Sequence, residues 1–521
     1  KSLLKVFEKF KKFAIVEIFT KVVAVVSLLH KFLENASGKK GQSLASTAYL
    51  AALDHLLNAF PSIGERIIDE LKSQRSHLKM IASENYSSLS VQLAMGNLLT
   101  DKYCEGSPFK RFYSCCENVD AIEWECVETA KELFAADCAC VQPHSGADAN
   151  LLAVMAILTH KVQGPAVSKL GYKTVNELTE EEYTLLKAEM SSCVCLGPSL
   201  NSGGHLTHGN VRLNVMSKLM RCFPYDVNPD TECFDYAEIS RLAKEYKPKV
   251  LIAGYSSYSR RLNFAVLKQI AEDCGSVLWV DMAHFAGLVA GGVFVDEENP
   301  IPYADIVTTT THKTLRGPRG GLVLATREYE STLNKACPLM MGGPLPHVIA
   351  AKTVALKEAL SVDFKKYAHQ VVNNARRLAE RFLSHGLRLL TGGTDNHMMV
   401  IDLGSLGISG KIAEDILSSV GIAVNRNSLP SDAIGKWDTS GIRLGTPALT
   451  TLGMGIDEME EVADIIVKVL RNIRLSCHVE GSSKKNKGEL PEAIAQEARD
   501  RVRNLLLRFP LYPEIDLEAL V

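Results

Sequence analysis

A strand–helix–strand repeat in the middle of the chain limits the folds that it can adopt. The apolar runs "KVLIAGY" at 249–255 and "SVLWVD" at 276–281 flank "FAVLKQIAEDCG" at 264–275, an amphipathic helical pattern that closes on glycine. The runs "CACVQ", "ADIVTTTT" and "GLVLAT" continue this rhythm between residues 121 and 325. Short strands separated by helices predict an α/β fold, in which a large, mostly parallel sheet carries helices on both faces.

The repeat is one of several parts that the sequence predicts. A chain of 521 residues is expected to form two or three domains, at about 100–200 residues per domain. The expected parts, in chain order, are a segment outside the fold at 1–43, an N-terminal helical arm at 44–84, a large sheet domain at 85–335 with an insert at about 160–193, a smaller α+β C-terminal domain at 336–475, and a linker with a C-terminal helix at 476–521.

Local patterns fill in these parts. The arm is expected to be helical with a turn at "FPSIGE", and the small domain to contain strands in "LRLLTGG", "NHMMVIDL" and "GIAVNR". The stretch "CHVEGSSKKNKGELPE" is interpreted as a polar linker before the amphipathic helix "AIAQEARDRVRNLLLRF". The insert shows no strand period.

The first 43 residues differ in character from the rest. They are rich in lysine, and Glu17 and Lys21 interrupt their longest apolar run, which argues against a membrane span. They lack a secretory cleavage site and the arginine and serine richness of a transit peptide. We expect a non-native or mis-assigned start outside the fold, with a native amphipathic extension or a targeting segment as the alternatives.

The net charge bears on the kind of partner that the protein binds, and the cysteine pattern bears on the compartment in which it works. The net charge is −2, from 58 basic and 60 acidic residues, which gives no reason to expect a nucleic acid as the main partner. Thirteen cysteines occur without a C-x-x-C pair, which favours free thiols in a reducing compartment over a zinc site. We therefore predict a cytoplasmic protein with no metal site and no nucleic-acid or membrane partner.

Polar side chains follow the predicted strands at the edge where parallel sheets bind ligands. Asp281 ends "SVLWVD", Lys313 follows "ADIVTTTT", and Ser256 follows "VLIAGY". The stretch "HSGADAN" at 144–150 lies between a strand and an apolar helix. We expect these four groups to meet at one edge of the sheet.

An amine, a carboxylate and an anion-binding turn match three parts of pyridoxal 5′-phosphate. A desolvated lysine can form an imine with an aldehyde, and a carboxylate can pair with a pyridinium nitrogen. A turn before a helix offers N–H groups to a phosphate. A nucleotide-binding α/β protein, or a structural ion pair between Lys313 and Asp281 without a site, is also compatible with this spacing.

Longer motifs add a family resemblance. "VTTTTHKTLRGPRGG" at 307–321 resembles the signature around the cofactor lysine of the serine hydroxymethyltransferase family. Other stretches are similar to that family in the same order: "IASENY", "DKYCEGSPFKRFY", "VQPHSGADAN", "GGHLTHG", "WVDMAHFAGLVAGG", "GGPLPHVIA", "TGGTDNHM", "VNRNSLP" and "SGIRLGTPALT". The resemblance covers about residues 45–515 and is greatest to chlamydial members.

The resemblance implies a fold and an activity. The fold would be the pyridoxal-phosphate-dependent transferase fold, which is aspartate aminotransferase-like and of type I. The activity would be the interconversion of L-serine and tetrahydrofolate with glycine and 5,10-methylenetetrahydrofolate, as a glycine hydroxymethyltransferase in one-carbon metabolism. A folate-independent aldolase or amino-acid racemase on the same cofactor is the alternative enzyme. A scaffold or RNA-binding relative without chemistry is disfavoured by the intact Lys313, Asp281 and Arg443.

The resemblance also implies a cofactor site. Lys313 would hold pyridoxal 5′-phosphate covalently as an internal aldimine, and Asp281 would pair with the pyridine nitrogen. The remaining cofactor contacts would be His205 stacked on the ring, His284 near the phenolic oxygen, Ser145, Gly146 and Ser256 mainly at the phosphate, and Thr310 as hydrogen-bonding support.

The implied substrate site uses further residues. Arg443 would bind the substrate carboxylate through two hydrogen bonds, supported by Ser83, and Glu105 would be the acid or base near the substrate hydroxyl, with Tyr113 beside it. The expected tetrahydrofolate contacts are Leu200, Leu206 and Asn427. Residues expected to reach the neighbouring subunit's site, which would make the working unit a homodimer or tetramer, are Tyr103, Glu105, Tyr113, Gly342 and Gly343.

The chain departs from the family pattern in two places. Ala147 follows "HSG", where the family usually has serine, and "PLMMGG" at 338–343 replaces a glycine-rich loop. One phosphate contact is therefore expected to be lost or replaced, and the loop before Gly342 to be bulkier. His208 is expected to be a hydrogen-bonded structural residue.

Overall fold

The computed structural model describes residues 44–209, 212, 214–430, 432, 439–480 and 483–515. The expectation for the lysine-rich segment 1–43 lies outside the described residues. The chain divides into two compact units, one made of residues 1–76 with 510–521 and the other of residues 77–509. The second unit carries all the candidate site residues.

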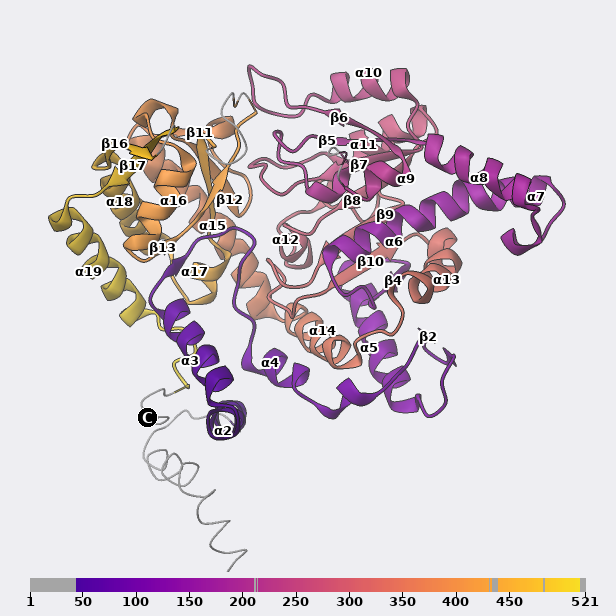
Figure 1. Cartoon of the computed structure of the whole chain (residues 1–521), viewed down its shortest axis with the longest axis horizontal. Helices are drawn as coiled ribbons and strands as arrows, with labels where there is room; N and C mark the ends of the chain where they lie inside the picture. The colour runs from indigo at the N-terminus through magenta and orange to yellow at the C-terminus, as the bar shows by residue number, and fades with distance from the viewer. Residues whose placement is uncertain are drawn as a thin grey trace, which may run out of the picture. The chain divides into compact units, whose positions relative to one another are not determined.

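The first unit contains two helices. Helix α2 spans Leu44–Ala59 and α3 spans Pro61–Arg75 (Figure 1). The turn predicted at "FPSIGE" is confined to Phe60, because Pro61 occupies the first turn of α3, where its missing N–H is not needed. The Arg75 guanidinium donates to three carbonyls near the other end of the chain, those of Leu511 at 2.9 Å, Tyr512 at 2.6 Å and Ile515 at 2.8 Å.

The second unit is built on a seven-stranded mixed sheet (Figure 1). In spatial order its strands are β4 (Cys138–Cys140), β10 (Gly321–Ala325), β9 (Ile306–Thr310), β8 (Val277–Asp281), β7 (Val250–Gly254), β5 (Val194–Pro198) and β6 (Arg221–Tyr225). The pairings from β6 to β9 are parallel, and β10 runs antiparallel to both β9 and β4. The predicted α/β class is confirmed, with one reversed strand in the predicted, mostly parallel sheet.

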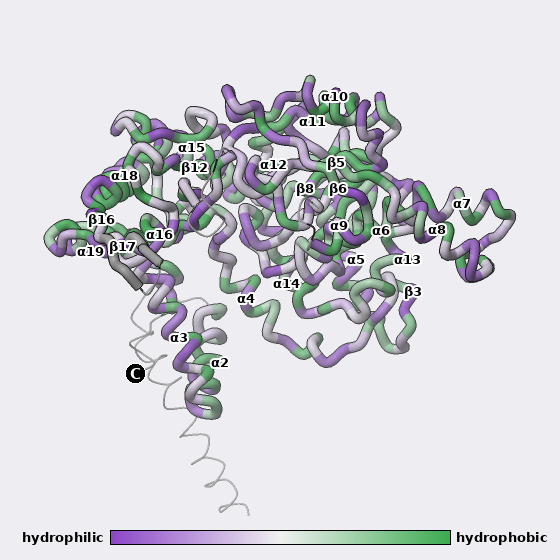
Figure 2. Tube along the Cα trace, turned by 45° about the horizontal axis from the view of Figure 1, so that its top comes forward, coloured by the Kyte–Doolittle hydropathy of each residue, from purple (hydrophilic) through white to green (hydrophobic). Residues whose placement is uncertain are grey.

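Both faces of this sheet are buried. Leu278 and Val280 of β8 pack in one apolar core, and Val277 and Trp279 pack in another on the opposite face. Helix α11 (Phe264–Asp273) contributes to the first core and α6 (Gly146–Leu158) to the second. The centre of the unit is correspondingly rich in hydrophobic residues around β5 (Figure 2). A strand buried on both faces reads as a continuous apolar run, which explains "VLWV".

The second unit contains further helices besides α6 and α11. They are α4 (Leu89–Met95), α5 (Glu117–Phe134), α7 (Gly164–Lys169), α8 (Glu180–Ser192), α9 (Met216–Leu219), α10 (Tyr236–Tyr246), α12 (Ala286–Ala290), α13 (Glu330–Met341), α14 (Pro346–Ala359), α15 (Val362–Ser384), α16 (Gly410–Ser419), α17 (Pro447–Thr451), α18 (Ile456–Arg471) and α19 (Glu492–Arg508). Two short strand pairs, β1 (Leu78–Lys79) with β13 (Ile422–Ala423) and β2 (Gly106–Ser107) with β3 (Lys110–Arg111), also belong to this unit.

The insert at 160–193 is helical. Helix α6 continues through a π-helical turn at Thr159–Gln163 into α7, and α8 returns toward the sheet (Figure 1). The stretch Gly146–Lys169 is long and apolar enough to cross a bilayer. Its α6 part packs inside the protein, with Leu152 and Ile157 fully buried, and a core helix passes the same test of length and composition.

A smaller antiparallel sheet carries the C-terminal part of the site. Its strands, in order, are β11 (Arg388–Leu389), β12 (Met398–Asp402), β15 (Gly441–Gly445) and β14 (Asn425–Asn427). Arg443 in β15 lies opposite Val400 on one side and Asn425 on the other. The strands predicted in "LRLLTGG", "NHMMVIDL" and "GIAVNR" are present as β11, β12, and β13 with β14. In the first of these stretches, Leu390–Gly392 forms a 3₁₀ turn.

The predicted polar linker is wrong over most of its length. Strand β16 (Arg474–Glu480) pairs antiparallel with β17 (Ser483–Glu489). Backbone pairing satisfies the N–H and C=O groups without an apolar pattern, so the polar composition gave no strand signal. Gly488 is also a packing residue, since a Cβ there would lie 2.4 Å from Cγ2 of Ile412.

Candidate active site

Asp281 is the fixed acidic group of the site. It ends β8, is 6% exposed, and lies opposite Thr308 in the register of β9. Its Oδ2 accepts hydrogen bonds from Nδ2 of Asn150 at 2.9 Å and from Nε2 of His208 at 3.0 Å, and its Oδ1 accepts from the N–H of Ala283 at 3.0 Å. Three donors therefore hold this buried carboxylate in one orientation.

The protonation of His208 follows from its two contacts. Its Nδ1 accepts the backbone N–H of His205 at 3.1 Å, so Nε2 carries the proton and donates to Asp281. Burial alone would raise the pKa of Asp281, but the hydrogen bond from His208 and the nearby charge of Lys313 outweigh it and hold the pKa below its ordinary value. Asp281 is therefore ionised.

Lys313 supplies a reactive amine beside that carboxylate. It follows β9 by three residues in a turn, and its carbonyl accepts a hydrogen bond from Nδ2 of Asn85 at 3.0 Å. Desolvation lowers the pKa of Lys313 to about 8, with Arg443 adding to the effect and Asp281 opposing it. A lysine of lowered pKa has a larger share of neutral amine, which is the nucleophilic form.

A tight turn before α6 offers an anion site. Ser145 caps the helix, its Oγ accepting the N–H of Asp148 at 3.1 Å, and Gly146 begins it. A Cβ on Gly146 would lie 2.5 Å from Cγ2 of Thr310, so only glycine lets the turn approach β9 this closely. Thr310 is held by a hydrogen bond from its Oγ1 to the carbonyl of Ala283 at 3.3 Å. The first turn of α6 favours a negative ligand.

Arg443 supplies a buried cation without a carboxylate partner in the described part of the chain. It is 9% exposed, and burial lowers its pKa to about 10. Its Nε and Nη2 donate to Oδ1 of Asn425 at 3.2 and 3.1 Å, and its Nη1 donates to the carbonyl of Ser256. These contacts fix the guanidinium plane, which suits two-point binding of a carboxylate ligand.

Ser83 lies in a segment that runs along the end of β15. The N–H of Gly445 donates to the carbonyl of Met80 at 2.8 Å, and a Cβ on Gly445 would lie 2.9 Å from Cα of Ala82. The segment therefore passes two residues from Arg443. Ser256 reaches the same region, because its N–H donates to the carbonyl of Gly203 at 2.6 Å while its own carbonyl accepts from Arg443.

Two candidate histidines are held as neutral rings. Nδ1 of His205 lies 2.7 Å from Oγ1 of Thr207, and burial lowers the pKa of His205 to about 4. His284 is buried, and burial together with the charges of Lys313 and Arg443 places its pKa well below the ordinary value. Neutral imidazoles can stack on or hydrogen-bond to a ligand ring without adding charge.

A second group of candidates lies together elsewhere. The rings of Tyr103 and Tyr113 are 4.9 Å apart, and partial burial followed by the charge of Glu105 raises the pKa of Tyr113. A Cβ on Gly342 would lie 3.7 Å from Oε1 of Glu105, and one on Gly343 would lie 3.4 Å from the Tyr103 ring. Among the described residues, no hydrogen bond, ion pair or ring contact joins this group to Lys313 or Asp281.

The expected folate residues are not gathered by direct contacts within the described structure. Leu206 is 58% exposed and Leu200 is partly buried. Asn427 lies in β14, where its Nδ2 donates to the carbonyl of Ser428 at 2.7 Å. A folate site at these residues remains a prediction.

Comparison with known proteins decides the family. A sequence model of the family described as serine hydroxymethyltransferase matches residues 57–172 and 183–466. The chain belongs to the serine hydroxymethyltransferase family. The predicted family is thus confirmed, and the unmatched residues 173–182 lie within the insert.

Relatives of high identity carry the same name. Proteins called serine hydroxymethyltransferase from Chlamydia abortus, Chlamydia caviae and Chlamydia trachomatis serovar D are 82%, 81% and 77% identical to this chain over 497 residues. Each match covers 95% of this chain and all of the relative. The similarity therefore includes both sheets and the site.

The residues present fit pyridoxal 5′-phosphate, on which serine hydroxymethyltransferases depend. The site offers an amine of lowered pKa, an ionised carboxylate and an anion-binding turn, which suit the aldehyde, the ring nitrogen and the phosphate of this cofactor. Nε2 of His144 and Nδ1 of His312 are also buried without a protein partner, next to Ser145 and Lys313 in sequence. Such unpaired polar atoms are expected around a polar ligand.

Asn150 is a site residue that the sequence did not indicate beyond its place at the end of "HSGADAN". It donates to Asp281 from α6. His208, expected as a hydrogen-bonded structural residue, donates to the same carboxylate from a 3₁₀ turn.

Proposed function

We propose that the chain is a pyridoxal-phosphate-dependent enzyme that interconverts L-serine and tetrahydrofolate with glycine and 5,10-methylenetetrahydrofolate. The observation that carries this proposal is the Lys313 amine, whose pKa is lowered to about 8, within electrostatic reach of an Asp281 carboxylate fixed by His208 and Asn150. Family membership and relatives of the same name support it.

The cofactor would be held at the carboxyl edge of the large sheet, in the manner of a type I pyridoxal-phosphate fold. Lys313 would bind its aldehyde covalently, Asp281 its ring nitrogen, and the Ser145–Gly146 turn its phosphate. Ala147 at the second position of α6 leaves that turn to backbone N–H groups and the Ser145 hydroxyl. His205 and His284 would lie against the ring.

Each chain residue has a task in the reaction. When bound, pyridoxal phosphate supplies an electron-withdrawing ring that accepts the electron pair released when a bond to the substrate Cα breaks. Asp281, kept ionised, holds a proton on the ring nitrogen through a hydrogen bond, which maintains that capacity. Arg443 binds the substrate carboxylate at two points and so sets the orientation of the Cα–Cβ bond of serine.

We propose that Glu105 moves the proton at the serine hydroxyl or at the folate. Glu105, Tyr103 and Tyr113 form a group of their own, joined to Gly342 and Gly343. We expect this group to serve the neighbouring subunit's site in a homodimer. Leu200, Leu206 and Asn427 would then hold tetrahydrofolate near the same reaction centre.

Glycine formation from serine, with and without tetrahydrofolate, tests this function. Cofactor-loaded protein is expected to release glycine and 5,10-methylenetetrahydrofolate in equal amounts, and Lys313→Ala to abolish both. Arg241→Ala, a change on the exposed face of α10, is the matched control and should leave turnover unchanged. Glycine formation at the same rate without the folate would contradict hydroxymethyl transfer and indicate an aldolase.

A further inference from the structure

His397 makes a buried contact that the site as described does not use. Its Nε2 lies 3.3 Å from Nδ1 of His284, and the ring centroids are 5.6 Å apart with an interplanar angle of 23°, so the two nitrogens face each other near the ring planes. His397 is fully buried, and its other nitrogen, Nδ1, has no hydrogen-bond partner. One nitrogen of His397 thus faces His284, a proposed cofactor-binding residue, and the other has no partner. This difference determines which ring nitrogens of the two histidines carry protons.

The segment around His397 is held from inside. Oγ1 of Thr394 donates to the carbonyl of Met398 at 2.6 Å, and the Met398 N–H donates to Oδ1 of Asn396 at 3.0 Å. Nδ2 of Asn396 donates to the carbonyl of Tyr258 at 2.9 Å. These bonds fix the backbone on both sides of His397, so its ring is presented to His284 in one orientation.

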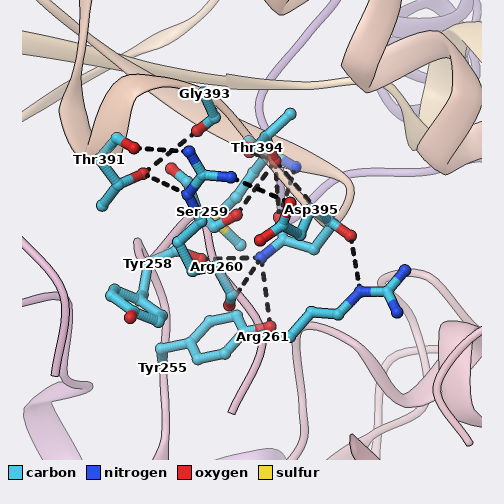
Figure 3. A network of polar contacts seen from close by, with 11 residues as sticks. Tyr255, Tyr258, Ser259, Arg260, Arg261, Thr391, Gly393, Thr394 and Asp395 are labelled. Atoms are coloured by element: carbon cyan, nitrogen blue, oxygen red, sulfur yellow. Dashed lines mark hydrogen bonds and ion pairs between the residues drawn. The ribbon is translucent and has the colours of Figure 1, made fainter.

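Two arginines tie the same segment to the large sheet (Figure 3). Arg260 donates from Nη1 to the Asp395 carboxylate at 3.0 Å and from Nε to Oγ1 of Thr391 at 3.1 Å. Nε of Arg261 donates to the carbonyl of Asp395 at 3.2 Å. The segment that leads into β12 is therefore anchored to the loop following β7. This anchoring restrains the position of the His397 backbone relative to the large sheet.

Both rings are neutral, so one proton is available for their shared contact. Burial, with the charges of Arg443 and Lys313, lowers the pKa of His397 to about 3, and burial and the same charges also lower the pKa of His284. A neutral imidazole carries one N–H and one bare nitrogen. Of the two facing nitrogens, one must donate and the other must accept.

The unpaired nitrogen decides between the two arrangements. If Nδ1 of His397 carried the proton, a buried N–H would have no acceptor, and orphaned N–H groups are rarer and costlier than bare acceptors. If Nδ1 is bare, the proton is on Nε2 of His397 and points at Nδ1 of His284. His284 must then carry its own proton on Nε2.

We propose that His397 is a positioning residue that fixes the tautomer of His284, so that His284 presents an N–H donor into the site. Nε2 of His284 has no partner among the described residues, which leaves this donor for a ligand. Its acceptor is an oxygen of the cofactor that carries negative charge, the phenolic oxygen. This inference rests on the proposed function, because it needs the cofactor to be bound at Lys313.

Two substitutions at one position separate the roles of the two nitrogens. In His397→Gln the longer side chain places an amide N–H where Nε2 was, and in His397→Asn the shorter one places it where Nδ1 was. We expect His397→Gln to bind pyridoxal 5′-phosphate within about threefold of the original protein and His397→Asn to bind it about tenfold or more weakly, the size of a lost hydrogen bond to a charged group.

A cofactor analogue distinguishes positioning from loss of structure. With 3-deoxypyridoxal 5′-phosphate, which lacks the phenolic oxygen, the affinity difference between His397→Asn and the original protein is expected to disappear. Equal losses with both ligands would overturn the inference and assign His397 a packing role. If the original protein binds neither ligand, the proposed function itself fails.

The proton positions can also be read directly. In protein labelled with ¹⁵N-histidine, bare and protonated ring nitrogens resonate at distinct frequencies, and His284→Gln and His397→Gln assign the two rings. Both rings are expected as the Nε2–H tautomer, in the cofactor-loaded protein and without cofactor. An Nδ1–H signal for either ring would contradict the inference while leaving the proposed function intact.

Discussion

Nε2 of His208 lies 3.0 Å from the Asp281 carboxylate, while Nδ1 of the same ring accepts the backbone N–H of His205. One imidazole thus joins the acidic group at the end of β8 to the loop that carries the proposed ring-stacking histidine. Its tautomer is set by these two contacts, so the orientation of Asp281 depends on a residue for which no cofactor contact is proposed.

Replacing His208 tests how much this bond contributes. His208→Leu leaves a buried carboxylate one donor short, and we expect the free energy of unfolding to fall by about 1.5–3 kcal/mol near neutral pH. His208→Gln, whose amide can donate from the position of Nε2, should lose less than half of that. Urea unfolding of both variants measures the difference, and equal losses would show that the bond to Asp281 is not the cause.

The lowered pKa of Lys313 predicts a pH dependence. The amine attacks an aldehyde only when it is neutral, so the rate at which the cofactor-free protein takes up pyridoxal 5′-phosphate should rise with pH and level off above about 8. An ordinary lysine would still be rising toward ~10.4. Stopped-flow absorbance at a series of pH values gives the midpoint.

The charge of Asp281 should move that midpoint. Asp281 raises the pKa of Lys313, opposing desolvation, so Asp281→Asn is expected to shift the midpoint to lower pH. A shift to higher pH, or none, would contradict the proximity of the two groups.

The approach of Gly146 to Thr310 predicts a compensating pair of changes. Gly146→Ala puts a methyl group 2.5 Å from Cγ2 of Thr310, and the displaced turn should bind pyridoxal 5′-phosphate about tenfold more weakly, the usual scale of overpacking. Thr310→Ser removes that methyl and keeps the hydroxyl. We therefore expect the double variant to bind more tightly than Gly146→Ala alone, as measured by equilibrium dialysis. If the double variant binds the cofactor as weakly as Gly146→Ala, contact with the Thr310 methyl group is not the reason for glycine at position 146.

Arg443→Lys separates carboxylate binding from cofactor binding. A lysine keeps the charge but cannot make two parallel hydrogen bonds, so KM for serine should rise by about ten- to a hundredfold. Cofactor affinity should change less than about twofold, because no role in cofactor binding is proposed for Arg443. An unchanged KM would remove Arg443 from substrate binding, whatever its effect on stability.

The large sheet could be predicted because its signals are local. Strands buried on both faces, such as Val277–Asp281, read as apolar runs, and the helix between two of them is amphipathic. The hairpin at 474–489 escaped prediction because polar strands paired through their backbones leave no apolar alternation. The reversal of β10 also has no local signature, since direction follows from the pairing partner.

The sequence predicted which residues form the candidate site, but it did not predict the contacts between them. Lys313 follows a strand and Asp281 ends one, and their motifs are conspicuous in the sequence. The partners of Asp281 come from α6 and a 3₁₀ turn, and the contact between His284 and His397 joins two sheets. Such pairs are 73 to 131 residues apart in the chain, so only the folded structure brings them together.

The covalent attachment of the cofactor at one side chain tests the central claim most directly. Cofactor-loaded protein is reduced with borohydride, digested, and analysed by mass spectrometry for a pyridoxyl-modified lysine. The account predicts modification at Lys313, and none at that peptide in protein that was never given the cofactor. An unmodified Lys313 in fully loaded protein, or a label at another lysine in its place, would contradict the account.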